Sequence, residues 1–304
     1  MANSLANVQQ IAQQTFVDGL ANSTEDYARC CEVLDYEGGT ARLMASNAGG
    51  LATAVSSATT AVAASDLTSG ISSIDQQAFA LKHSIPWAQL NWSMNLAEDV
   101  GRQLANAAAQ NINKLFFDGL ESTFTLPHPM AVATAGGVGA GQAFCDTGQG
   151  YALTTPAAGV QNNLGVAALA EASLSAARSL LREYRNQQAL PMNMGAGEDL
   201  VLVVGPENER TAKELITSEL SGADMAANTF RQYADVVVYP LTVDGSDWWL
   251  LNKRLSPVGI WMSEAPTLIT RESDDGLFVN FVARFQASFY VKAYEYGIIG
   301  NNVP

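Results

Sequence analysis

The side chains that could take part in chemistry are few, and none of them forms a recognisable group. His83 and His128 are the only histidines, and neither has a cysteine or an acidic pair at the spacing of zinc ligands. The glycine cluster at 136–141 lacks the Lys-Ser or Lys-Thr pair of a phosphate-binding loop. The Gly-x-Ser-x-Gly motif of serine hydrolases is absent. We therefore expect no catalytic serine, no metal site and no bound cofactor.

The thiols and carboxylates have structural explanations. Cys30 and Cys31 are adjacent and Cys145 is distant, so the three cysteines give no disulfide framework, and a buried structural role is favoured over a reactive thiol. The carboxylate pairs lie at a predicted helix start or in turns, where local structure accounts for them. These pairs are Glu98/Asp99, Glu198/Asp199 and Asp274/Asp275. Because every common catalytic pattern is missing, the sequence favours a structural or binding protein over an enzyme.

The composition excludes several classes of protein. The chain has 304 residues, 48% of them hydrophobic, which allows a sizeable core in about two domains. Only 15% are charged, and 16 basic against 30 acidic residues give a net charge of −14. The chain therefore lacks the excess of Lys and Arg that nucleic-acid-binding proteins and polybasic membrane-surface proteins need, and both classes are excluded. The composition suits an assembly subunit, although an Ala/Ser/Thr-rich monomer has the same character.

No targeting or membrane-spanning segment is predicted. The N-terminus has neither the basic nor the apolar region of a signal peptide. The uncharged stretch 48–65 consists mainly of Ala, Gly, Ser and Thr, and transferring it into hydrocarbon would gain little free energy. We expect synthesis in the cytoplasm and no membrane partner.

The elements that would position these residues are helices and strands in a mixed order. Apolar residues recur at three- and four-residue steps over 96–118 and 167–188, which predicts two amphipathic helices, and Gly119 is placed to end the first. A third helix begins at Pro206 and runs to about residue 220. Apolar or alternating runs predict strands at 200–204, 234–239, 247–252, 257–262 and 277–294.

The N-terminal third is different in character. Residues 1–37 mix helical-looking pieces with Asn and Gln, and 46–73 is a low-complexity Ala/Ser/Thr/Gly tract. Weak alternation at 40–45 and 74–83 on either side of the tract predicts a long two-stranded excursion over 40–83. An isolated hairpin of this kind is marginal in water, so it needs another surface to lie on.

Several segments carry a resemblance to a known family. They are 115–120 (Leu-Phe-Phe-Asp-Gly-Leu), 144–149 (Phe-Cys-Asp-Thr-Gly-Gln), 162–164 (Asn-Asn-Leu), 200–207 (Leu-Val-Leu-Val-Val-Gly-Pro-Glu), 248–251 (Trp-Trp-Leu-Leu) and 293–297 (Ala-Tyr-Glu-Tyr-Gly). In order, spacing and character the chain resembles tailed-phage major capsid proteins of the Hong Kong 97 fold, and in detail Mu-like major head subunits. The match is strongest from 96 to 297 and weakest before it.

The resemblance implies an α+β fold with five parts. They are an N-terminal arm (1–37), an extended loop (38–85), a peripheral domain (86–165) with a spine helix (96–118), an axial domain (166–262), and C-terminal strands (263–304) that return to the peripheral domain and end near the axial domain. It also implies that the chain is a head protein of the virion and not an enzyme. Its copies would form the hexamers and pentamers of an icosahedral shell, which encloses double-stranded DNA without sequence-specific binding. Decoration, scaffolding and portal proteins are possible partners.

The residues that we expect at contacts between subunits come from three of these parts. They are Arg42, Phe79 and Lys82 in the extended loop, Leu104 and Ile112 on the spine, and Trp248 and Trp249 in the axial strands. The tryptophans are interpreted as core or contact residues rather than as a ligand platform.

Three other interpretations stay open. An encapsulin-like nanocompartment would share the fold but enclose protein cargo. A monomeric acidic hydrolase would need a carboxylate pair that the patterns above do not reveal. A secreted surface-layer or adhesion protein would explain the Ala/Ser/Thr tract, but the missing signal peptide argues against it.

Overall fold

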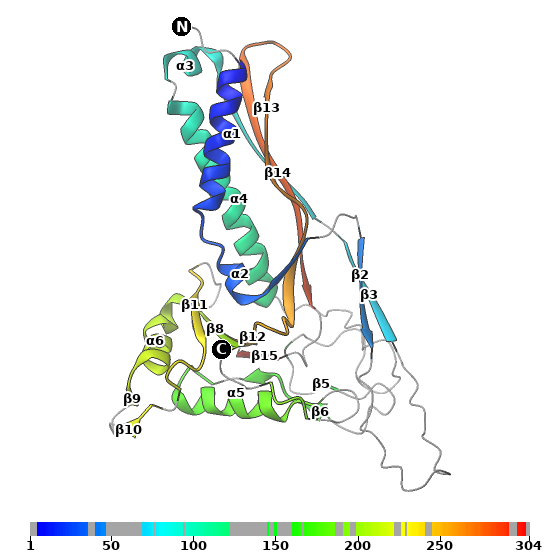
Figure 1. Ribbon diagram of the computed structural model, residues 1–304, viewed down its shortest axis with the longest axis vertical. Coiled ribbons are helices and arrows are strands. Elements are labelled where there is room, and N and C mark those ends of the chain that lie inside the picture. The colour runs from blue at the N-terminus through cyan, green and yellow to red at the C-terminus, as the bar shows by residue number, and fades with distance from the viewer. Residues whose placement is uncertain are drawn as a thin grey trace, which may run out of the picture.

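A computed structural model shows a mixed helix-and-sheet subunit with an elongated limb standing on a broader base (Figure 1). It describes residues 5–35, 40–46, 69–75, 77–93, 95–121, 145, 149–150, 160–165, 167–185, 191–194, 199–221, 226–228, 230–240, 245–291 and 297–301. None of the helices in these ranges is both long and apolar enough to cross a membrane.

The limb consists of helices packed on a four-stranded sheet. The helices are α1 (Leu5–Ala21), α2 (Asp26–Cys30), α3 (Trp87–Trp92) and α4 (Asn95–Glu121). The sheet order is β1 (Glu32–Asp35), β13 (Val258–Glu272), β14 (Phe278–Val291) and β4 (Gln77–Pro86). Strand β1 runs parallel to β13, and the other pairs are antiparallel. The long helix predicted at 96–118 and the long strand predicted at 277–294 are confirmed.

Strand β13 is much longer than the strand predicted at 257–262. Its distal half, opposite β14, contains Pro266, which cannot donate a backbone hydrogen bond. The pairing register shifts between Met262 and Glu264 and again between Glu264 and Thr267. These irregularities accommodate the proline and explain why the alternation of the sequence breaks while the strand continues.

Helix α1 packs along α4 through small residues that bring the two backbones close together. A Cβ on Gly101 would overlap Thr15 Oγ1 and lie 2.6 Å from the Ala12 carbonyl oxygen. A Cβ on Gly19 would lie 2.8 Å from Ala105 Cβ. Residues 5–21 of the expected N-terminal arm therefore form a helix in the core of their own subunit rather than a protruding segment.

The base is built around a five-stranded sheet with helices on both sides. The strand order is β11 (Asp235–Val238), β8 (Leu200–Val204), β12 (Trp248–Asn252), β15 (Ile298–Asn301) and β7 (Leu164–Gly165). Every residue of β8 and β12 is buried, so both faces of the sheet centre are covered. Helix α5 (Glu171–Glu183), the 3-10 turn η4 (Pro206–Asn208) and α6 (Glu209–Thr217) complete the base. Three predicted strands are thereby confirmed as β8, β11 and β12.

Two-residue strands form two further ladders. They are β5 (Gln149–Gly150) with β6 (Val160–Gln161), and β9 (Leu220–Ser221) with β10 (Ala226–Ala227).

The two-stranded excursion is shorter than predicted. Strand β2 (Thr40–Ser46) pairs with β3 (Ser69–Asp75), from Thr40 opposite Asp75 to Ser46 opposite Ser69, and this hairpin projects from the side of the limb (Figure 1). The following segment, β4, pairs with β14 over its whole length instead. Most of 74–83 thus belongs to the limb sheet, because its apolar residues Phe79, Leu81 and Ile85 alternate toward the core. The tip of the predicted excursion lies outside the described residues.

Two details of the predicted helices are wrong. Helix α4 continues through Gly119 to Glu121, and a Cβ at this glycine would lie 2.5 Å from Phe289 Cγ, so Gly119 permits close packing rather than ending the helix. Helix α5 is shorter than 167–188 because Ser173 Oγ accepts the Ala170 N–H at its start and the backbone becomes extended at Tyr184.

The buried apolar residues form two clusters. The distal cluster comprises Val8, Ala12, Phe16, Ile85, Leu90, Ala97, Val100, Leu104, Ala105, Leu268, Val279, Phe281 and Ala283. The basal cluster joins the five-stranded sheet with α2, α5, α6, the end of α4 and the near ends of β13 and β14. Helix α4 contributes to both clusters and so couples limb to base.

Candidate functional site

Phe79 and Lys82, two of the predicted contact residues, lie on β4, at one edge of the limb sheet. The Phe79 ring stacks on Phe285, with ring centroids 4.9 Å apart, so one face of the ring is covered within the subunit. Lys82 is exposed opposite Val282. Arg42 lies on β2 opposite Ser73, and its side chain is outside the described structure. A contact role for these residues stays a prediction.

The other four predicted contact residues are buried inside the subunit. Leu104 is 1% exposed, Ile112 2%, Trp248 0% and Trp249 4%. The Trp248 indole N–H donates to the Ala167 carbonyl at 3.1 Å, which satisfies its polar atom inside the base. A side chain without exposed surface has nothing left for a neighbour to cover. These four residues belong to the subunit's own core, and a contact role for them stays a prediction that the burial within one subunit does not support.

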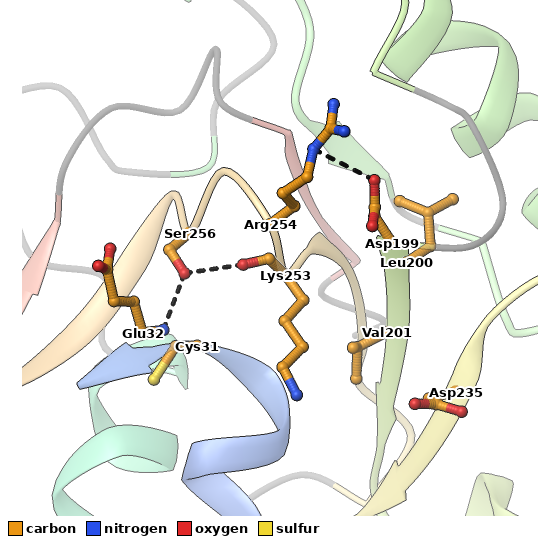
Figure 2. A pocket seen from close by; sticks show the side chains of 9 residues that line it. All are labelled: Cys31, Glu32, Asp199, Leu200, Val201, Asp235, Lys253, Arg254 and Ser256. Atoms are coloured by element: carbon orange, nitrogen blue, oxygen red, sulfur yellow. Dashed lines mark hydrogen bonds and ion pairs between the residues drawn. The ribbon is translucent and has the colours of Figure 1, made fainter.

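Limb and base meet at a polar junction that encloses a hollow of about 440 Å³ (Figure 2). The turn 253–256 links β12 of the base to β13 of the limb, and it lies beside the start of β1 and of β8. The Lys253 N–H donates to the Asp199 carbonyl at 2.7 Å, and Arg254 Nε lies 3.3 Å from Asp199 Oδ2. These contacts fasten the turn to the base sheet.

Ser256 ties the same turn to the N-terminal segment. Its backbone is left-handed, with φ of 43°, and its side chain is buried. The hydroxyl donates to the Lys253 carbonyl at 2.9 Å and accepts the Glu32 N–H at 2.8 Å (Figure 2). Because φ in this range is unfavourable for a residue other than glycine, the surrounding hydrogen bonds must hold the turn in place.

Buried amides fix two further segments, one at the junction and one within the limb. The Asn252 side chain donates to the Met194 carbonyl at 3.2 Å and accepts the Leu255 N–H at 3.1 Å. On α4, Asn113 Oδ1 accepts the Tyr27 N–H at 3.1 Å and Nδ2 donates to the Thr24 carbonyl at 2.9 Å. Sequence reasoning did not identify Ser256, Asn252 or Asn113, although the polar interruption 252–256 between two apolar strands is a signal that could have indicated the joint.

Among the described residues, the polar groups of the junction serve to hold limb and base together, and none of them is set up as a nucleophile or a metal ligand. Burial raises the pKa of the Cys31 thiol to about 12, which keeps it protonated, and its Sγ–H donates to the Tyr27 carbonyl. The Ser256 hydroxyl is fully used by backbone groups. The part of the chain that the structure describes contains no group of three His, Cys, Asp or Glu residues able to hold a metal. The expected absence of a metal or cofactor stays a prediction.

Solved structures with this fold are capsids and particles. The capsid of Ralstonia phage GP4 matches with a TM-score of 0.60 and 12% identity, covering 91% of this chain and 87% of that one. The capsid of an empty GTA particle matches with a TM-score of 0.55 and 12% identity, covering 92% of this chain and 89% of that one. A virus-like particle from Pyrococcus furiosus matches with a TM-score of 0.53 and 12% identity, covering 96% of this chain and 98% of that one. The fold is therefore the Hong Kong 97-type capsid fold, as the sequence predicted.

The family follows from the sequence itself. Residues 72–299, most of the chain, match the family model described as phage capsid protein, so the chain belongs to that family. A search of curated proteins finds no match. The chain is a structural protein of the capsid, and this role agrees with a junction built from structural hydrogen bonds. The closer likeness to Mu-like head subunits stays a prediction.

Proposed function

We propose that this chain is the major head protein of a tailed phage, and that its copies form the hexamers and pentamers of an icosahedral shell around double-stranded DNA. The observation that carries this proposal is the match of 72–299 to the capsid family on an elongated subunit with a projecting hairpin. The net charge of −14 supports it, because an acidic wall does not bind the packaged duplex along its length. Synthesis takes place in the host cytoplasm, and the protein works in the virion.

In this proposal the limb is the peripheral domain and the base is the axial domain. Hairpin β2–β3 is the part of the extended loop that projects from the limb, and it lies on a neighbouring subunit. Strand β4 offers a second surface, because it is the edge of its sheet and its outer backbone groups face away from β14. Scaffolding, decoration and portal proteins are further partners of the shell.

Electron microscopy of the expressed protein tests the proposal. We expect hollow particles by negative stain and elution far ahead of the monomer in size exclusion. Nucleic acid in particles from infected cells supports a phage head, whereas an enzyme as cargo would support the encapsulin-like alternative, which the family match does not favour. A protein that stays monomeric at every concentration would overturn the proposal.

Charge reversal at the edge strand tests the contact surface. Lys82→Glu should reduce particle yield about tenfold while leaving the subunit folded, because an exposed charge contributes to a contact but not to the core. Lys82→Arg keeps the charge and is the matched control. Normal particles from Lys82→Glu would show that β4 lies outside the contact.

A further inference from the structure

Helix α5 carries an arginine face on a chain that is acidic as a whole. Arg178 and Arg182 stand one turn apart on it, and Arg185 follows the end of the helix by two residues. Within the described residues, Arg178 and Arg182 form no ion pair, whereas Arg210 and Arg284 each have a carboxylate partner, at 2.7 Å and 2.9 Å. No carboxylate in the described part of the subunit is therefore paired with either of these two guanidinium groups.

Arg178 is held in a fixed position. Its guanidinium carbon lies 4.6 Å from the centroid of the Tyr233 ring and 6.0 Å from that of Phe230. Its Nε is buried and has no hydrogen-bond acceptor among the described residues, while the side chain as a whole stays partly exposed. Burial raises the pKa of the Tyr233 phenol, and the positive charges of Arg178 and Arg182 oppose that rise.

A hollow of about 700 Å³ lies at the C-terminal end of α5, next to this face. Among the described residues, Arg182, Glu183 and Arg185 are the charged residues that line it. Its wall is firmly held: Gln161 accepts the Arg185 N–H at 2.7 Å and donates to the Arg185 carbonyl at 2.9 Å. The Tyr184 hydroxyl lies 3.1 Å from the carbonyl oxygens of both Asn162 and Ile298.

We propose that the arginine face of α5, with this hollow, binds carboxylate side chains on a second copy of the same chain. The inference rests on the proposed function and names a partner surface within it. Contacts around a ring of subunits join two different surfaces, so a basic face on one copy requires an acidic surface on the next. With 30 acidic against 16 basic residues, each copy presents an excess of carboxylates. A planar guanidinium group that is already held in place, as that of Arg178 is, binds a carboxylate with two hydrogen bonds and little further ordering.

The observations favour carboxylates over the phosphates of nucleic acid. A duplex is bound by cations that follow its evenly spaced phosphates. Here Glu171 and Glu183 lie on the same helix, and the nearby Arg231 is paired with Glu219 at 2.9 Å. A short basic face between carboxylates matches a localised acidic contact rather than a polyanion.

Neutralising one arginine tests the proposal, with a matched control on another helix. Arg182→Gln removes a charge from the face, whereas Arg210→Gln removes one from α6, where Glu214 of the same helix is the partner. Sedimentation velocity over a concentration series gives the concentration at which particles form, at low and at high salt. We expect Arg182→Gln to raise the concentration at which particles form about tenfold, because a hydrogen bond to a charged group is lost. This concentration should also depend less on salt than it does for the wild type. Arg210→Gln should behave like the wild type.

The outcomes separate the possible failures. Equal assembly of Arg182→Gln and wild type would overturn the inference and leave the proposed function standing. Normal assembly with a lower ratio of absorbance at 260 to 280 nm would assign the face to nucleic acid instead, which also overturns it. A wild type that never assembles would overturn the proposed function itself. Arg182→Lys, which keeps the charge but not the planar pair of donors, should recover only part of the lost assembly. An unchanged melting temperature of Arg182→Gln would show that folding is intact.

Discussion

The limb and the base are stabilised in different ways, although α4 belongs to both. In the limb, two helices approach closely at glycine and alanine positions and cover one face of a sheet. In the base, large side chains such as Trp248 and Tyr239 fill the space on both faces of a sheet. The burial pattern of strand β13 shows this difference along one strand. Every residue over 258–261, next to the base, is buried, whereas near Leu268 only alternate residues are buried.

This difference indicates where assembly surfaces are available. A sheet with one covered face leaves its other face to solvent or to a neighbour, whereas a sheet covered on both faces is closed. The limb therefore offers its open face, the edge strand β4 and the hairpin β2–β3. The base offers only the outer sides of its helices, among which the α5 arginine face is the most distinctive in charge.

The largest effect that we expect comes from the core of the base. Trp248→Ala should lower the free energy of unfolding of the unassembled subunit by about 4 kcal/mol, since it removes a fully buried indole and leaves the Ala167 carbonyl without its donor. Chemical denaturation measures the loss. Trp248→Phe, which keeps a ring but not the N–H, should cost about half as much. If both variants were as stable as the wild type, the basal cluster would not depend on aromatic volume.

A smaller effect is expected from the helix contact of the limb. Gly101→Leu should cost about 2–3 kcal/mol, because its side chain would displace α1 from α4. Hydrogen exchange should increase in α1 and the first half of α4 while β8 and β12 stay protected. Gln103→Leu, which adds the same side chain on the exposed face of α4, is the control. Equal loss of protection in limb and base would show that the two clusters unfold as one unit.

Periodic elements of the fold could be predicted from the sequence. Helix α4 lies within three residues of the range predicted at each end, and β8 has the predicted bounds, because uninterrupted periodicity and an apolar run are local signals. Pairing partners are not local. The alternation of β4 is the same whether it pairs with β2, as predicted, or with β14, and the choice is made by residues some 200 positions away.

The candidate site was harder to predict for the same reason. Apolar residues such as Leu104 and Trp249 look alike in sequence whether they face their own core or a neighbouring subunit. Ser256 and Asn252 at the junction and Asn113 in the limb are polar residues whose role depends on backbone groups distant in sequence, such as the Glu32 N–H for Ser256. Only the fold shows that these polar groups are buried and satisfied.

The smallest expected effect concerns the tip of the limb, the turn between β13 and β14. Here the Asp275 carboxylate accepts the Leu277 N–H at 3.1 Å and the Ser273 hydroxyl, which itself accepts the Phe278 N–H at 3.0 Å. The Ser273 hydroxyl, followed by the Leu277 N–H, lowers the pKa of Asp275 below its ordinary value. The turn holds two apolar side chains at the surface, with Leu277 62% and Phe278 38% exposed.

The sign of the pH effect follows from this lowered pKa. A carboxyl whose pKa is lower in the folded state stabilises that state above its ordinary pKa, and the contribution disappears as the pH falls through the folded-state value. We therefore expect the Leu277 and Phe278 amides to lose hydrogen-exchange protection, corrected for intrinsic rates, as the pH drops below about 4. Asp275→Asn should remove this dependence, while Asp274→Asn should retain it. Since the turn lies far from the basal cluster, protection of β8 should not change with it, and a parallel loss there would mean that acid acts on the whole subunit rather than on the tip of the limb.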